Sequence, residues 1–319
     1  MAASSNLMPT SSRARYGVAT PVEVGLYLAL VMFGLLLWWT SRYRASVVPM
    51  LGPWEFSWSW FLGTSAALWW YVRGLFATPS PERPPVWRSL LYFVGVVAIY
   101  AVLQTRFEYL AQHMFFLNRI QALVLHDIGP ILIALSWPGA VLAQGMPTFA
   151  RRIMYALTAS RLMRLFRQPL VVAVAFVAIM VLWLVPTVHF RAMIDPKLYQ
   201  AMNWSMVLDG LLFWLLVLDR RPKPPAPISY GARMLMMVAV MMWQTIIGAC
   251  IALSTLDLYA FYDWCGRIYP SIGAMQDQQL GGLIIWIPPF MMTAMALIVV
   301  SYRLLQASSK NTKEITSCI

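Results

Sequence analysis

Residues 231–253 read GARMLMMVAVMMWQTIIGACIAL, and this stretch decides the fold class. Its only charged residue is Arg233, close to its beginning. About 20 consecutive, mostly apolar residues are enough for a helix to cross the hydrocarbon core of a bilayer. The stretch therefore predicts a transmembrane helix.

Further stretches of the same character predict eight transmembrane helices in total. The candidate spans cover residues 22–40, 56–72, 87–104, 109–136, 169–187, 203–219, 231–253 and 281–303. The fourth is the least regular, because it carries Asn118, Arg119, His126 and Asp127. We expect it to be either one long tilted helix or a helix that is broken near Gly129-Pro130.

The composition agrees with a membrane protein. Of the 319 residues, 60% are hydrophobic and 11% are charged, whereas a soluble domain has about 25% charged residues. Such a chain has too few polar side chains to cover a surface in water, so we expect membrane lipid as its solvent. The predicted fold class is all-α, a polytopic helical bundle.

The net charge of +12 does not indicate a nucleic-acid partner. The basic residues lie in short clusters between apolar runs, which is typical of topology signals. Of the 24 Lys and Arg, 17 lie in the N-terminus, in loops near 73–88, 144–168 and 220–233, and in the C-terminus. Six lie in the alternate loops, and Arg119 lies inside a span. Both termini are therefore predicted to be cytoplasmic, although Arg42 and Arg44 lie on the opposite side.

Ionisable side chains inside spans are costly and need a reason to be there. The candidates are His113, Arg119, His126, Asp127 and Asp209. One interpretation is structural, with charges that neutralise each other and hydrogen-bonded imidazoles in packing positions. The other is functional.

Three residues are predicted to lie at the outer ends of their spans and could converge on one outward site. They are His113, His189 and Asp277. Met114 follows His113 directly, and imidazole, carboxylate and thioether together suit copper. The three His of the chain also set a limit of one bis-His haem, so a membrane haem or redox protein is a further hypothesis.

Methionine is abundant in the last two spans. The bland interpretation is gap-filling and lipid-facing side chains. The alternative is a soft-ligand path for Cu(I) in a copper transporter or copper-tolerance protein. The residues concerned are Met234, Met236, Met237, Met241, Met242, Met291, Met292 and Met295.

The last third of the chain resembles a known family. Residues 277–288 read DQQLGGLIIWIP, which is similar to the D-Q-Q-x-x-G-x-x-x-W-x-P signature of CtaG-like cytochrome c oxidase assembly factors. Residues 69–74 (WWYVRG), 111–114 (AQHM) and 210–214 (GLLFW) resemble further family segments, in the same order. The resemblance covers roughly residues 54–305. It adds Gln112, Gln278, Gln279 and Trp286 to the functional candidates.

The chain departs from the family pattern at several His positions. Tyr109, Leu184, Tyr199 and Asn203 stand where the family pattern has His. If those His bind copper in relatives, this chain has lost most of the ligands. Tyr109 is kept as a functional candidate because it stands in the motif that contains His113.

The resemblance implies a bacterial inner-membrane assembly factor, not an enzyme. Its expected partners are nascent cytochrome c oxidase subunits and a copper donor protein, and its expected role is metallochaperone-like delivery of copper at the outer face. We expect four segments: a polar cytoplasmic N-terminus (1–20), an additional transmembrane helix (21–50), a seven-helix CtaG-like membrane domain (51–305) and a cytoplasmic C-terminal tail (306–319).

Overall fold

The structure, a computed structural model, describes residues 21–49, 51–166, 168–224, 226–264 and 266–317, and these ranges contain helices and no strand. The predicted N-terminal segment 1–20 lies outside them. The longer helices are α1 Pro21–Tyr43, α2 Trp58–Ala77, α3 Val86–Gln104, α10 Pro169–Leu184, α12 Pro196–Val217, α13 Tyr230–Ala252 and α14 Ala274–Ser317. The shorter ones are α4 Arg106–His113, α5 Phe115–Leu123, α6 Gly129–Ser136, α7 Gly139–Gly145, α8 Thr148–Ala159, α9 Arg161–Leu165 and α11 Pro186–Ile194. Single turns lie at Ala45–Val47, Ser80–Glu82 and Ala260–Asp263.

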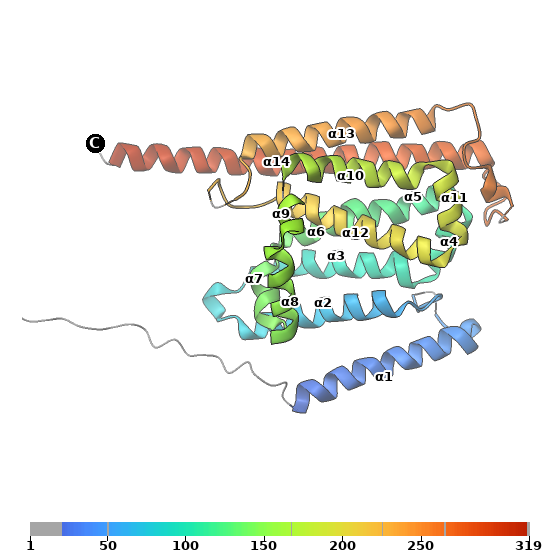
Figure 1. The fold of residues 1–319 in the computed structure, drawn as a ribbon, viewed down its shortest axis with the longest axis horizontal. Coiled ribbons are helices and arrows are strands. Elements are labelled where there is room, and N and C mark those ends of the chain that lie inside the picture. Colours follow the sequence, from blue (N-terminus) through green and yellow to red (C-terminus); the bar gives the residue numbers. More distant parts are fainter. Residues whose placement is uncertain (1–20, 50, 167, 225, 265, 318–319) are drawn as a thin grey trace, which may run out of the picture.

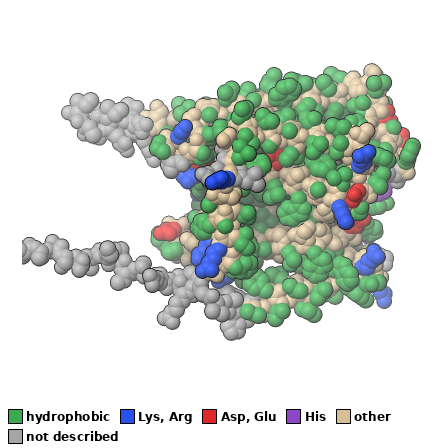
Figure 2. All heavy atoms as spheres, viewed as in Figure 1, with side chains coloured by type: hydrophobic (Ala, Val, Ile, Leu, Met, Phe, Trp, Pro, Cys, Tyr) green, Lys and Arg blue, Asp and Glu red, His purple; other side chains and the backbone are tan. Residues whose placement is uncertain are grey.

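The long helices run along one common direction and form a bundle (Figure 1). We call the end that holds α4, α11 and residues 253–273 the distal end. At the opposite, proximal end, α1 begins, α14 ends, and α7 and α8 lie across the bundle (Figure 1). Hydrophobic side chains cover the length of the bundle, and charged side chains gather mostly at its two ends (Figure 2). This is the surface expected of a protein whose middle is in lipid.

Among the described residues, six helices are long and apolar enough to cross a membrane, and the bent pair α10–α11 gives a seventh. The prediction of a multi-pass helical membrane protein is confirmed, and the number of eight spans is approximate. The remaining candidate is α2, a 20-residue helix that reads WSWFLGTSAALWWYVRGLFA. Its Trp, Ser and Arg residues lower its hydropathy, but it lies beside α3 and α7 in the bundle.

The fourth predicted span is interrupted, but not at Gly129-Pro130. Helix α4 ends at His113, the helix is broken at Met114, and residues Phe115–Ser136 then form a single span. Met114 is extended, with φ −145° and ψ 135°. Pro130 follows a π-helical turn at Val124–Ile128. That turn carries the helix up to Gly129-Pro130 without a break.

Close helix contact fixes the position of the π-helical turn. A Cβ atom on Gly210 of α12 would lie 2.4 Å from the carbonyl oxygen of His126 and 2.9 Å from Cγ of Pro130. Only glycine permits this approach of α12 to the turn. The π-helical turn and the middle of α12 are thereby held in direct contact inside the bundle.

The C-terminal segment continues the last helix. α14 is 44 residues long and continues to Ser317, with Pro288 and Pro289 inside it. Residues 306–317 are therefore a helical extension of the last span.

Candidate functional site

The DQQ motif fastens the distal end of the bundle. Asp277 is 1% exposed, and its carboxylate accepts hydrogen bonds from the backbone N–H groups of Phe115 (3.0 Å) and Phe116 (2.8 Å). Arg267 forms an ion pair with the same carboxylate at 2.8 Å. The first N–H groups of a helix have no partner within that helix, and a carboxylate also favours the positive end of the helix dipole. Asp277 of α14 therefore caps α5 and explains why the helix can restart after Met114.

Gln278 continues this arrangement into the distal loop. Its side chain accepts from the N–H of Leu258 at 2.7 Å and donates to the carbonyl of Leu256 at 2.9 Å. Gln279 is exposed. Trp286 is half-buried and packs where Gly248 lets α13 approach α14. Asp277 and Gln278 thus hold the loop through an ion pair and hydrogen bonds, whereas Gln279 lies on the surface.

His189 is completely buried and has both ring nitrogens engaged. Nδ1 lies 3.0 Å from the carbonyl oxygen of Trp183, and Nε2 lies 2.9 Å from the hydroxyl of Tyr262. A carbonyl only accepts, so Nδ1 carries the hydrogen and the neutral ring accepts from Tyr262 at Nε2. Burial raises the pKa of Tyr262 well above its ordinary value, so its hydroxyl stays a donor. His189 is therefore one of the buried, hydrogen-bonded residues that hold the distal loop in place.

His113 lies in a different environment. Its Nδ1 is 2.7 Å from the carbonyl oxygen of Tyr109 in the preceding turn, and its ring lies 4.1 Å from that of Tyr109. Tyr109 is exposed, and both Gln112 and His113 are half-buried. Met114 is completely buried. Because Nδ1 donates to a carbonyl, the lone pair of the neutral imidazole is on Nε2.

The predicted copper ligands share the distal end but do not surround one point. Phe115 links them, since its N–H bonds to Asp277 and its ring lies 5.9 Å from that of His189. In the part of the chain that the structure describes, no three His, Cys, Asp or Glu side chains form a group that could hold a metal ion. The carboxylate of Asp277 and the Nε2 of His189 already have hydrogen-bond partners. These residues do not fit a shared resident metal site.

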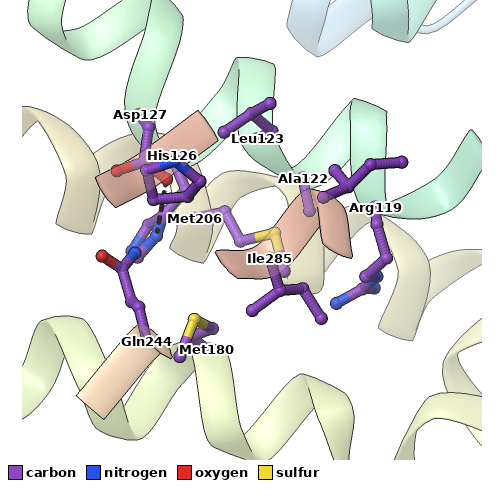
Figure 3. Close-up of a pocket in the computed structure, with 11 residues that line it drawn as sticks. Arg119, Ala122, Leu123, His126, Asp127, Met180, Met206, Gln244 and Ile285 are labelled. Carbon is purple, nitrogen blue, oxygen red and sulfur yellow. Dashed lines mark ion pairs between the residues drawn. The ribbon is translucent and has the colours of Figure 1, made fainter. Parts of the chain in front are cut away.

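A second polar cluster lies inside the bundle, around the π-helical turn (Figure 3). The Nε2 of His126 is 3.2 Å from Asp209 on α12, and its Nδ1 is 3.9 Å from Asp127. The imidazole stacks on Phe176 of α10 at 3.8 Å between ring centroids. Gln244 of α13 also lies beside Asp127. The sequence singled out the two Asp and His126, and the structure brings them together.

A cavity of about 30 Å³ lies beside this cluster, and Arg119, Met180, Met206 and Gln244 are among its lining residues. One water requires roughly 10–15 Å³ of such space, so the cavity has room for one or two. Arg119 donates to Asn118 and lies 5.2 Å from the ring of Phe115. The cluster thus contains two carboxylates and an imidazole inside the bundle, joined by the hydrogen bond between His126 and Asp209, and the Arg119 guanidinium lines the same cavity.

The methionines of α13 and α14 do not line one path. Met236 and Met237 are buried in the core, whereas Met242, Met291 and Met295 are exposed on the bundle surface. Met234, Met241 and Met292 are half-buried. Gap-filling and lipid contact describe these positions, and no observation here favours a copper path through them.

Sequence reasoning missed several residues of both regions. Gln244 is the main addition to the interior cluster, and Arg267 and Tyr262 are the main additions at the distal end. Gln244 is the amide inside the apolar stretch 231–253, which is a signal that could have found it. Arg267 and Tyr262 lie in a long loop, where sequence alone does not reveal their partners.

The chain is thus a multi-pass helical membrane protein. Buried, hydrogen-bonded residues hold a loop at its distal end, and a small polar cluster lies in its interior. The family described as cytochrome c oxidase caa3 assembly factor matches residues 67–307, and the chain belongs to this family. No curated protein and no solved structure matches the chain. The predicted resemblance is confirmed, and α1 lies outside the matched range.

Proposed function

We propose that this protein assists the assembly of a haem-copper cytochrome c oxidase without catalysing a reaction. We place it in a bacterial inner membrane, with the distal end facing outward to the nascent oxidase subunits. Membership of the oxidase assembly family carries the proposal. The distal end suits a docking role because Asp277, Gln278 and His189 hold its loop in place from beneath.

We also propose that copper is delivered or inserted at this end, as cargo that comes from a donor protein. His113 is the residue best suited to the transfer, because its Nε2 lone pair is available and its ring is not fully buried. Neutral imidazole is a good copper ligand. A single such ligand supports brief transfer between proteins, with Asp277 and His189 serving as scaffold.

The test compares a deletion strain with strains that express the wild type, His113→Ala or Gln276→Ala. Gln276 is an exposed distal residue and serves as the matched control. We expect the deletion to lower the haem-copper oxidase spectrum and activity, and wild type and Gln276→Ala to restore both. His113→Ala should restore them only when copper is added to the medium.

Two outcomes would contradict these proposals separately. Normal oxidase content in the deletion strain would overturn the assembly role. Full rescue by His113→Ala without added copper would overturn the copper transfer step and leave assembly through protein contacts.

A further inference from the structure

A hollow of about 660 Å³ opens at the distal end between α1 and the rest of the bundle. Its lining includes Trp38 and Arg42 from α1, Trp54 and Glu55 from the connection to α2, and Glu108 from α4. Sites for small molecules typically occupy about 300–1,000 Å³. The hollow is therefore large enough for an organic group and lies where several helices end.

Glu108 is the unusual member of this lining. It is 2% exposed, and among the described residues its Oε2 has no hydrogen-bond partner. A buried carboxyl oxygen without a partner costs free energy, so such a group requires a reason. Burial and, second, the nearby Glu55 hold the pKa of Glu108 well above its ordinary range. A positively charged donor placed in the hollow would give Oε2 a hydrogen-bond partner and would stabilise the ionised carboxylate of Glu108.

The charges of the hollow suit a ligand that carries both signs. Glu55 and Glu108 offer acceptors for an ammonium group, and Arg42 offers a guanidinium for a phosphate. Trp38 and Trp54 also line the hollow, and Trp is enriched in the headgroup region of a membrane. The pattern matches a zwitterionic headgroup better than an anion or a simple cation.

Helices α1 and α2 also enclose an apolar crevice. It measures about 500 Å³ and lies between Leu26, Leu30 and Phe33 of α1 and Leu68 and Val72 of α2. Phe33 precedes Arg42 by nine residues, about 14 Å along a helix, and one leaflet of hydrocarbon is roughly 15 Å deep. An acyl chain that starts at the hollow therefore reaches the crevice.

Gly34 lies between these two spaces in the sequence and is where α1 touches α2. A Cβ atom there would come within 2.8 Å of the rings of both Phe61 and Trp58. Most other large side chains of α1 are exposed. α1 is thus held against α2 at Gly34 and by the hydrogen bond that Trp70 Nε1 donates to the hydroxyl of Tyr27 at 3.3 Å. The rest of its surface leaves room for lipid.

We propose that the cleft between α1 and the bundle binds a phospholipid with a phosphoethanolamine headgroup. The ammonium group donates to Glu108 and Glu55, the phosphate meets Arg42, and the acyl chains lie along α1 and α2. The proposal does not rest on the oxidase assembly role. Arg42 and Glu55 lie outside the matched range 67–307, whereas Glu108 lies inside it.

The experiment uses the purified full-length protein, incubated with equal amounts of phosphatidylethanolamine and phosphatidylglycerol and then analysed by native mass spectrometry. We expect wild type to retain the ethanolamine lipid in about tenfold preference, the difference that one charge-assisted hydrogen bond provides. Glu55→Gln and Glu108→Gln should bring the two lipids close to equal retention. Arg42→Ala should lower the retention of both, because both carry a phosphate.

Glu82→Gln is the matched control, since Glu82 is an exposed glutamate in the turn between α2 and α3. Glu55 is itself exposed, so its substitution tests the site without a folding defect. An ethanolamine preference that persists in both Glu55→Gln and Glu108→Gln would overturn the proposal. So would displacement of the lipid by soluble phosphoethanolamine, or by a lysine-rich peptide, at equal molar concentration.

Discussion

The Asp277 carboxylate accepts three hydrogen bonds while it is almost completely buried, and a substitution tests what they contribute. Asp277→Asn keeps the shape but removes the charge that faces Arg267. Breaking a buried ion pair by changing one partner costs about 3–5 kcal/mol. We expect the free energy of unfolding in detergent to fall by about 3 kcal/mol, measured by tryptophan fluorescence.

Asp263→Asn is the control for this substitution. Asp263 pairs with the same Arg267, but its side chain is half exposed. Exposed pairs contribute at most about 1 kcal/mol. Equal losses in the two variants would contradict a special role for Asp277.

Glu108 should make stability depend on pH in a predictable direction. Its folded-state pKa lies well above the ordinary value of 4.5, chiefly because it is buried and also because Glu55 is near. The folded protein therefore binds this proton more tightly than the unfolded chain does. The stabilisation is fully present below pH 4.5 and is lost as the pH rises through the folded-state pKa.

The measurement is the unfolding free energy of wild type and of Glu108→Gln in lipid-free detergent, from about pH 4 to about pH 8. The value for wild type minus that for the variant should decrease as the pH rises. A difference that stays constant with pH would show that Glu108 does not carry this proton.

At the scale of elements, the contact between α12 and the π-helical turn makes its own prediction. Gly210→Ala places a methyl group against backbone atoms of His126, which cannot move aside as a side chain would. Overpacking of this kind costs about 1–3 kcal/mol. We expect a lower unfolding midpoint and a disturbed pair of His126 and Asp209.

Gly231→Ala is the matched control, because a Cβ atom on Gly231 meets nothing within 4 Å. This variant should be as stable as the wild type. A Gly210→Ala protein that is equally stable would mean that the two helices separate easily at this point.

Most transmembrane elements could be predicted from the sequence, because each apolar stretch is a local property. The break at Met114 could not. Methionine is a good helix former, and the helix ends there because a carboxylate from α14 caps the next one. The π-helical turn and α7 to α9 were also missed, since their positions depend on packing against other helices.

For the candidate sites, too, the sequence predicted what depends on local features and missed what depends on packing. Sequence predicted His113, His189 and Asp277 at one end, and in the structure they lie at the distal end without surrounding one point. Their hydrogen-bond partners, such as Tyr262 and Arg267, come from a loop whose path no spacing reveals. Glu108 escaped notice because a single glutamate after a span resembles an ordinary surface residue, and only the fold buries it.

At the scale of the whole molecule, the arrangement of charges predicts which end faces the cytoplasm. The clusters of Lys and Arg near α8 and between α12 and α13 lie at the proximal end, where cytoplasmic charge is expected. A fluorescent protein fused after residue 319 should therefore fluoresce. Alkaline phosphatase fused within residues 266–273 should be active, because that enzyme requires an oxidising compartment.

The reverse pattern of the two fusions would invert the topology and place the distal loop inside the cell. A fusion of alkaline phosphatase at Glu82, in the turn between α2 and α3, is the control and should be inactive.

The cap on α5 also has a consequence for synthesis. The N–H of Phe115 and the carboxylate that it requires are separated by 162 residues. A ribosome that adds about 5–20 residues per second needs roughly 10–30 s to cover that interval. During this interval the first N–H groups of a newly inserted α5 lack their carboxylate partner. The distal end is therefore completed only after the final span leaves the ribosome.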